Sequence, residues 1–297
     1  MLAAMLFPAP PAPAFPADQV MTTEGHLHYE DVAQDGRLMP IAIPPVLGGL
    51  WRGVLRKHAQ HRAAIAKGIL PLLTRMTIES FDQPIRVDQP VQTRAGFELA
   101  HDLEGGNVSR LFMNVWAEVH GAGGKIGSRE PGALALAGRL FAEHTFTRPF
   151  GPAEQRRVTR FDLDGHAEPA ARYECPPAPT AQDAPQGARW LDELSPDPID
   201  LVFSLDQTDS NQHVNSLVYV RMFLDAAQRR LADLSESMKL RSRAVDIAYR
   251  KPAFVGDRVR AYVRPFELAG GLGAAGFVAT PGEEGKPRCY VRVLFGA

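Results

Sequence analysis

The sequence predicts an α+β protein of two successive domains, each an antiparallel β-sheet wrapped around a long central α-helix. The chain has 297 residues, 45% of them hydrophobic, whereas a typical domain has about 100 to 150 residues. Its two halves also follow one plan, in which a short strand leads into a long helix and then into several alternating strands. A helix with one apolar stripe must bury it, and a sheet is the simplest partner in this order of elements.

The expected domain boundaries follow changes in composition. Residues 1–23 form an arm rich in alanine and proline, which we expect to be disordered because prolines break regular structure. Met21, inside this arm, is a second candidate for the start of translation. We expect the N-terminal domain at residues 24–150 and the C-terminal domain at residues 199–297. Between them, residues 151–198 contain the segment PPAPTAQDAPQG and are interpreted as a linker.

The first half begins with a predicted strand at residues 26–32. Pro44 and Pro45 suit the first turn of a helix, and apolar residues continue at helical spacing as far as residue 55. Glycines in this helix each cost about 1 kcal/mol relative to alanine, so they indicate close packing against a neighbouring backbone or sheet; they are Gly48, Gly49 and Gly53. Strands are predicted at 70–81, 91–101 and 108–120, and a short helix at 134–141.

The second half repeats this plan. A strand is predicted at 199–205, a helix at 214–234, and further strands at 243–251, 257–266, 274–280 and 287–295. Val245, Ile247 and Tyr249 alternate with less apolar residues, which is typical of a strand with one buried face. The order predicts a second antiparallel sheet around the helix at 214–234.

The most informative motif lies just before that helix. Asp209, Asn211 and His213 place a carboxylate, an amide and an imidazole within five residues. A loop that ends at a helix N-terminus supplies unpaired backbone N–H groups and the positive end of the helix dipole, which suit a developing oxyanion. Val214 and Asn215 are the candidate oxyanion donors. An ordinary Asx turn with a helix cap is the other interpretation of the same residues.

With Tyr219, this run resembles the DxNxHVNN…Y signature of the acyl-ACP thioesterases. The resemblance implies a tandem hotdog fold, in which the N-terminal hotdog shapes the acyl pocket and the C-terminal one carries the motif. It implies that His213 acts on water as a base, that Asn211 contacts the substrate carbonyl, and that Asp209 orients the other two. It also implies a reaction that needs no metal and no redox cofactor. Tyr219, Phe223 and Trp51 are candidate pocket residues, with core packing as the alternative.

The sequence departs from this family at one position. Family members have a glutamate, often followed by cysteine, after a Tyr-Arg-Arg-like stretch, but here Tyr249-Arg250-Lys251 is followed by Pro252-Ala253. Neither residue can accept a proton or act as a nucleophile. Asp246 is a candidate replacement carboxylate, although a solvent-facing strand residue is the more ordinary interpretation.

The charge distribution bears on partners. The chain has 33 basic and 34 acidic residues, so the overall charge favours neither nucleic-acid binding nor a strongly acidic channel. Residues 229–260, however, include nine basic and four acidic residues, so this segment has a local excess of positive charge. Arg250, Lys251 and Arg258 are candidate contacts for the phosphates of coenzyme A or for an acidic acyl carrier protein, and a solvated sheet face is an equal alternative.

The composition also suggests where the protein works. Two distant cysteines, Cys175 and Cys289, give no disulfide scaffold or thiolate metal site, and a reducing cytoplasm is the expected compartment. No apolar run approaches the roughly 20 residues of a membrane-spanning helix. Because a covalent tandem can pair its own sheets, we expect a monomer or a homodimer.

Three functions compete for this sequence. The first is hydrolysis of a fatty or polyketide-type acyl thioester of acyl carrier protein or coenzyme A. The second is a hydratase or dehydratase acting on a carrier-bound enoyl or hydroxyacyl thioester, although His213 comes one residue too early for that related motif. The third is a non-catalytic acyl-thioester-binding protein on a degenerate hotdog, suggested by Pro252-Ala253.

Overall fold

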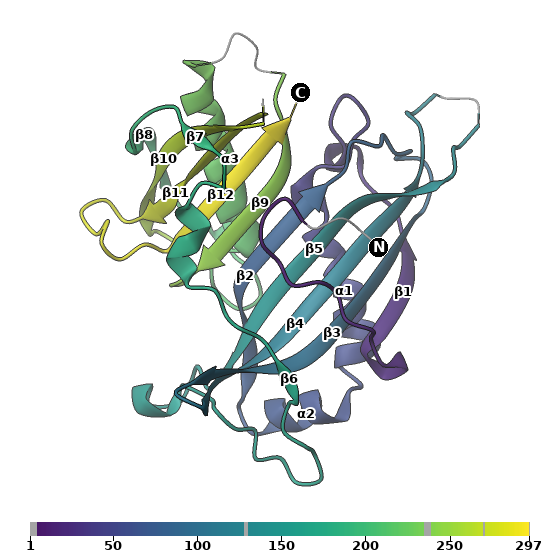
Figure 1. Ribbon diagram of the computed structural model, residues 1–297, viewed down its shortest axis with the longest axis vertical. Helices are drawn as coiled ribbons and strands as arrows, with labels where there is room; N and C mark the ends of the chain where they lie inside the picture. The colour runs from purple at the N-terminus through teal and green to yellow at the C-terminus, as the bar shows by residue number, and fades with distance from the viewer. Residues whose placement is uncertain (1–4, 128–129, 235–238, 270, 297) are drawn as a thin grey trace.

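One sheet, antiparallel except for the short pairing of β6 with β3, runs through both halves of the molecule. The computed structural model describes residues 5–127, 130–234, 239–269 and 271–296. In this part of the chain a 12-stranded sheet has the order β1-β3-β4-β5-β2-β9-β12-β11-β10-β7, with β6 beside β3 and β8 beside β10 (Figure 1). The single crossing from one half to the other is the pair β2 and β9, where Met76 lies opposite Ile247.

Both halves of the sheet have the same internal order. The first half consists of β1 (Val20–Gly25), β2 (Leu70–Ser80), β3 (Val91–Glu104), β4 (Asn107–Ala122) and β5 (Leu134–Thr147). The second consists of β8 (Ser195–Val202), β9 (Arg241–Tyr249), β10 (Arg258–Leu268), β11 (Gly271–Ala279) and β12 (Cys289–Gly296). Read outward from the β2–β9 pair, the first runs β2, β5, β4, β3, β1 and the second β9, β12, β11, β10, β8. The repeat expected from the sequence is therefore present in the strand order.

The helix of the second half, α3 (Ser216–Ala232), begins and ends close to the predicted bounds. Asn215 caps it, because its Oδ1 accepts the N–H of Leu217 at 2.9 Å. Its buried face carries Tyr219, Phe223 and six other side chains. The helix packs on β9, β10, β11 and β12, so it buries its apolar stripe against the concave face of this half of the sheet.

The corresponding helix of the first half is broken into short pieces. They are η3 (Pro40–Ala42), η4 (Pro44–Val46), α1 (Leu47–Leu50), the π-helical turn η5 (Trp51–Leu55) and α2 (Ala59–Ala66). The glycines explain part of this irregularity, since a Cβ on Gly53 would lie 2.6 Å from Cε of Met21 and a Cβ on Gly49 would lie 3.2 Å from Oγ1 of Thr23. The predicted close packing is confirmed, with β1 as the neighbour. The predicted continuous helix is not observed.

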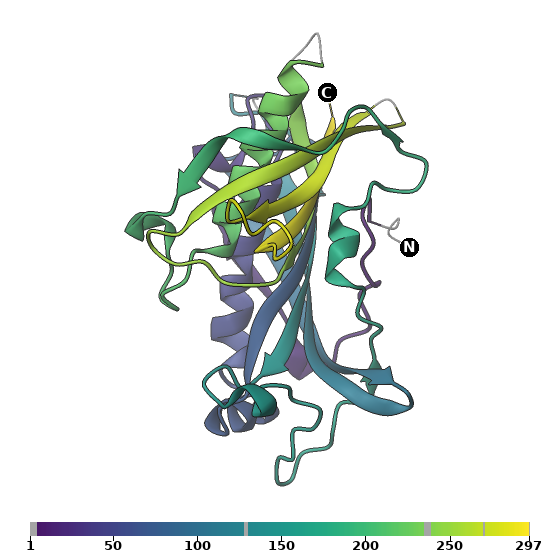
Figure 2. The ribbon, with the colours of Figure 1, turned by 90° about the vertical axis from the view of Figure 1, so that its left-hand side faces the viewer.

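The α-helices cover one face of the sheet, and the N-terminal segment with the segment between the halves, including the short turn η7, covers the other (Figure 2). On the second face, Phe7 is only 1% exposed, and Trp116 Nε1 donates to the carbonyl of Pro10 at 2.9 Å. The segment between the halves adds Tyr173, which is 8% exposed, and Ala181, which is 0% exposed. It contains η6 (Ala153–Gln155), β6 (Ala171–Arg172), η7 (Ala178–Gln182) and β7 (Arg189–Trp190). Contrary to expectation, the described part of the arm packs on the protein, as does the linker.

Two local predictions are wrong. Residues 134–141, predicted as a short helix, belong to β5, because pairing with both β4 and β2 overrides the helix propensity of leucine and alanine. The first strand is β1 at Val20–Gly25, upstream of the predicted 26–32, where Tyr29–Asp31 form the 3₁₀ turn η2. The remaining 3₁₀ turns are η1 (Ala17–Gln19) and η8 (Leu205–Gln207). No helix in the described ranges has both the length and the apolar character required to cross a bilayer.

Candidate active site

The motif loop, residues 208–215, joins η8 to α3 as a tight turn. The N–H of Asp209 donates to the carbonyl of His213, and the N–H of Gln212 donates back to the carbonyl of Asp209, both at 2.9 Å. Gln212 adopts a φ of 64° to close the turn, a region that non-glycine residues visit rarely. Asp209 Oδ1 also accepts the N–H of Asn211 at 2.8 Å. The backbone is thus shaped by an Asx turn, the alternative that the sequence left open.

The three candidate catalytic side chains share this loop without forming a hydrogen-bonded relay. Asp209 is half-buried, whereas Asn211 and His213 are exposed. Asp209 Oδ1 binds only the backbone of Asn211, and among the described residues no hydrogen bond joins the side chain of one of the three to the side chain of another. The imidazole of His213 instead packs edge-on against the ring of Phe254, with the ring centroids 5.3 Å apart. The structure therefore places the three groups together but leaves the imidazole and the amide facing solvent.

The two expected oxyanion donors are already engaged. The N–H of Val214 donates to the carbonyl of Ala253, and the N–H of Asn215 donates to the carbonyl of Gln207, both at 2.9 Å. These bonds fix the helix N-terminus to the turn after β9 and to η8. An N–H group that is bonded within the fold is not free for a substrate oxygen. The expected role of Val214 and Asn215 is therefore not supported by the geometry.

The turn that follows β9 carries a carboxylate that the sequence interpretation missed. Oδ2 of Asp257 accepts the N–H of Phe254 at 3.1 Å and lies 3.6 Å from Nη2 of Arg288. Nη1 of Arg288 donates to the carbonyl of Pro252 at 2.9 Å, so Asp257 and Arg288 together fix the shape of the turn, which the Val214–Ala253 bond ties to the motif loop. One signal was available, since Asp257 is the only acidic residue between Asp246 and Glu267.

Asp246 is neither a surface residue nor part of the motif site. It is 0% exposed, and its carboxylate accepts hydrogen bonds from Arg75, Thr77 and Arg292 at 2.7 to 3.2 Å. Burial by itself lowers the pKa of Arg75, but the hydrogen bond and charge of Asp246 outweigh it and raise that pKa. The expectation of a solvent-facing residue is wrong, because the face of the sheet opposite the helices is covered by other segments. The expectation of a replacement carboxylate gains no support from this geometry, since both carboxylate oxygens bind arginine.

The candidate pocket residues lie in the core. Tyr219 is 3% exposed and Phe223 is 0% exposed, and the Tyr219 ring packs against the rings of Phe203 and Tyr249. Burial raises the pKa of Tyr219, and its hydroxyl has no hydrogen-bond partner among the described residues. Trp51 lies in the first half, where it contacts the imidazoles of His61 and His144. Core packing is therefore what the structure shows for Tyr219 and Phe223.

The candidate carrier contacts surround an exposed apolar area next to the motif loop. Arg250, Lys251 and Arg258 are exposed, and Arg258 forms an ion pair with Asp200 at 3.4 Å. Four large apolar side chains on the neighbouring segments are also exposed, by 47% to 73%: Val202, Leu205, Phe254 and Val255. Backbone bonds between Phe203 and the turn at Gly256–Asp257 hold these segments together.

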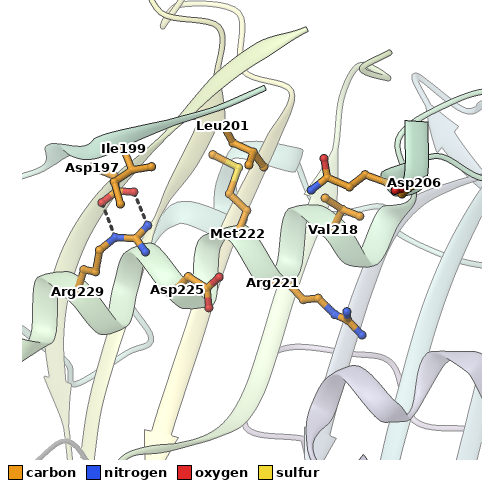
Figure 3. Close-up of a pocket in the computed structure, with 10 residues that line it drawn as sticks. Asp197, Ile199, Leu201, Asp206, Val218, Arg221, Met222, Asp225 and Arg229 are labelled. Atoms are coloured by element: carbon orange, nitrogen blue, oxygen red, sulfur yellow. Dashed lines mark hydrogen bonds and ion pairs between the residues drawn. The ribbon is translucent and has the colours of Figure 1, made fainter. Parts of the chain in front are cut away.

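A groove of about 420 Å³ runs between α3, β8 and η8. Figure 3 shows Arg229 reaching Asp197 across its end, through two hydrogen bonds of 3.0 and 2.5 Å. The floor is apolar, and charged side chains form the rim; the apolar residues are Ile199, Leu201, Val218 and Met222, and the other charged ones are Asp206, Arg221 and Asp225. Gln207 lines the groove and also binds the N–H of Asn215. The groove therefore ends at the motif loop.

Solved structures of similar shape include three thioesterases. A protein assigned as an oleoyl thioesterase from Lactobacillus plantarum matches 94% of this chain and 97% of its own, with a TM-score of 0.62 and 14% identity. The 12:0-ACP thioesterase from Umbellularia californica matches 93% of this chain and 94% of its own, with a TM-score of 0.59 and 13% identity. An acyl-ACP thioesterase from Bacteroides thetaiotaomicron matches 93% of this chain and 98% of its own, with a TM-score of 0.55 and 18% identity.

The chain has the fold of acyl-ACP thioesterases. This is the hotdog fold, as the sequence resemblance implied. No protein-family model and no curated protein sequence matches the chain. At identities of 13% to 18% the likeness establishes the fold alone, and function must be argued from the residues of the site.

Proposed function

We propose that this protein hydrolyses acyl thioesters of acyl carrier protein or coenzyme A, and that it is a tandem hotdog with domains at residues 24–150 and 199–297. Two observations support the proposal together. Thioesterase structures match more than nine-tenths of the chain, and the motif loop stands at the N-terminus of the longest helix in the described part of the chain. The second observation carries the proposal, because a fold alone supports many reactions.

In the proposed reaction His213 removes a proton from water as the water oxygen bonds to the thioester carbon. Asn211 donates its side-chain amide to the developing oxyanion, a role that falls to it because the N–H groups of Val214 and Asn215 are engaged. The C–S bond then breaks, and the imidazolium returns the proton to the departing thiolate. The products are a free acid and a free thiol. Asp209 holds the loop in shape by accepting the N–H of Asn211.

Substrate binding is expected to orient the exposed side chains of Asn211 and His213 toward the thioester. Catalytic hydrogen bonds are often long or absent before substrate binds and tighten in the complex. The carrier or coenzyme A is proposed to approach over Arg250, Lys251 and Arg258, with the exposed Phe254 and Val255 in contact with its apolar parts. Phe254 contacts His213, and the N–H of Val214 binds Ala253 of the same turn, so a thioester at the motif loop would lie beside this turn.

The test is mass spectrometry of purified protein after incubation with a panel of acyl-carrier and acyl-coenzyme A thioesters. We compare wild type with His213→Ala and with Ser210→Ala, which alters an exposed residue of the same loop. Free acid produced by wild type and Ser210→Ala but abolished in His213→Ala supports hydrolysis at this loop. A retained thioester that gains or loses the mass of water indicates a hydratase or dehydratase. Saturable binding without any conversion indicates a non-catalytic binding protein.

A further inference from the structure

Two histidines lie inside the first half of the molecule, on the helix-covered face of the sheet. His61, on α2, is 3% exposed, and His144, on β5, is 6% exposed. The indole of Trp51 contacts both, with centroid distances of 5.7 Å to His61 and 6.0 Å to His144. We call these three side chains the imidazole–indole cluster. Proposed thioester hydrolysis at the motif loop uses neither imidazole.

The hydrogen-bonding state of the cluster is unusual for a protein core. By hydrogen-bond geometry, neither Nδ1 nor Nε2 of His61 has a partner among the described residues; burial lowers the pKa of His61, and the nearby backbone of Leu55 offsets this only in part. Nδ1 of His144 lies 3.3 Å from the carbonyl of Met113. Because a carbonyl only accepts, that contact requires a proton on Nδ1 and leaves Nε2 of the neutral ring as an acceptor. Burial lowers the pKa of both imidazoles, so both are neutral near pH 7.

A core position filled only for packing would favour an apolar side chain here. Buried polar groups without a partner cost free energy, and most of those in native proteins have a bonding partner. His61 offers one donor and one acceptor, and His144 offers a second acceptor. A hydroxyl group both donates and accepts, so it matches this set, whereas a keto oxygen could use only the single donor of His61.

The strand register places the cluster at the motif end of the sheet. His144 lies opposite Leu73 of β2, and Arg75 of β2 lies opposite Ala248 of β9. His144 is therefore level with the turn that follows β9, whose Ala253 binds the N–H of Val214. Two strand spacings separate β5 from β9, which is about 10 Å. That lateral spacing is shorter than a fatty acyl chain.

We infer that the imidazole–indole cluster contacts the acyl chain and selects thioesters whose chain carries a hydroxyl group. The inference rests on the proposed function for the position of the thioester and for the entry of the chain. Trp51 begins the π-helical turn η5, and such turns recur at functional sites. His61 and His144 are specificity determinants in this scheme, and His213 remains the group that acts on water.

The first experiment compares the hydrolysis of matched thioesters, one saturated and unsubstituted, the others with a hydroxyl near the carbonyl, in mid-chain or at the chain end. The variants are His61→Phe, His61→Gln, and His120→Phe as a control on β4 outside the cluster. At least one hydroxylated substrate should lose roughly five- to tenfold in kcat/KM in His61→Phe, the scale of one or two neutral hydrogen bonds. The unsubstituted substrate should change less than about twofold, and His61→Gln, which keeps a donor and an acceptor, should recover part of the loss.

The second experiment measures binding without catalysis, using non-hydrolysable thioether analogues of the same acyl chains and calorimetric titration. Wild type should bind one hydroxylated analogue more tightly than the unsubstituted one, and His61→Phe should remove that preference. Equal affinity of wild type for all analogues overturns the inference. A preference in binding together with no hydrolysis of any thioester would refute the proposed function and leave the inference standing. Hydrolysis of thioesters with no preference for a hydroxylated chain would support the proposed function and overturn the inference.

Discussion

The backbone N–H of Val214 donates to the carbonyl of Ala253 at 2.9 Å and ties the start of α3 to the turn after β9. This bond holds Phe254 close to His213 and fixes the motif loop to the segment Pro252-Ala253, where the sequence resemblance led us to expect a glutamate. The proposed site is therefore built from two loops that are distant in sequence.

Replacing Phe254 by alanine should slow thioester hydrolysis on the order of tenfold, because a freer imidazole spends less time in the productive position. Phe254 is 47% exposed, so stability should change by less than about 0.5 kcal/mol. Steady-state kinetics and thermal melting check the two parts. Phe150→Ala is the matched control, since Phe150 is also an exposed phenylalanine, at 92%, and lies after β5 in the first half of the chain. Equal rates in both variants would argue against a positioning role for Phe254.

Replacing Asp246 by alanine should destabilise the fold by about 3 to 5 kcal/mol, because it leaves the buried cations of Arg75 and Arg292 without their shared partner. Urea unfolding measures this loss. The exposed pair of Arg157 and Glu104 provides the comparison, and Glu104→Ala should cost less than about 1 kcal/mol. If Asp246→Ala lowers the free energy of unfolding only slightly, water must reach the guanidinium groups of Arg75 and Arg292.

Acid should weaken the fold through His144. Burial lowers the pKa of this imidazole from 6.5 to about 4, so between these values the unfolded chain binds the proton more readily than the folded one. The free energy of unfolding therefore falls as the pH decreases through this window. At about pH 5 the loss from this one group approaches about 2 kcal/mol relative to about pH 7. Urea titrations at both pH values should show a smaller loss in His144→Phe than in wild type, and parallel losses would contradict the assignment.

The N-terminal arm should contribute to stability. Phe7 is 1% exposed and its ring lies 5.0 Å from the guanidinium carbon of Arg292. Phe7→Ala should cost about 3 kcal/mol, as for other buried phenylalanines, whereas Leu6→Ala, at a position 38% exposed, should cost much less. Chemical denaturation distinguishes the two. Equal and small losses would mean that the arm does not pack in solution.

The fold was predictable where the local pattern and the tertiary partner agree. The apolar stripe that ends in Leu231 predicted α3 to within two residues at each end, and alternation around Ile247 predicted β9. The pattern failed at residues 134–141, because leucine and alanine favour helix and only the pairing with β4 and β2 makes β5. It also failed for Asp246, because the segments that bury it carry no regular period.

The candidate site was predictable only in part. The position of Asp209, Asn211 and His213 before a helix follows from sequence, and the structure agrees on that position. The hydrogen bond from the Val214 N–H to Ala253 could not be predicted from the sequence, because a backbone hydrogen bond between distant loops does not depend on the residue types of either loop. The same holds for His61 and His144, which meet only through Trp51.

The pairing of β2 with β9 also has a consequence for assembly. A strand at a sheet edge presents unpaired N–H and C=O groups that can template another chain. In the described sheet each half covers the edge that the other would expose, and the ends of the strand order are β1 and β7, of which β7 is only two residues long. Covalent fusion thus protects the two halves from cross-chain strand addition. Either half produced alone would expose a full-length strand edge and be prone to aggregation.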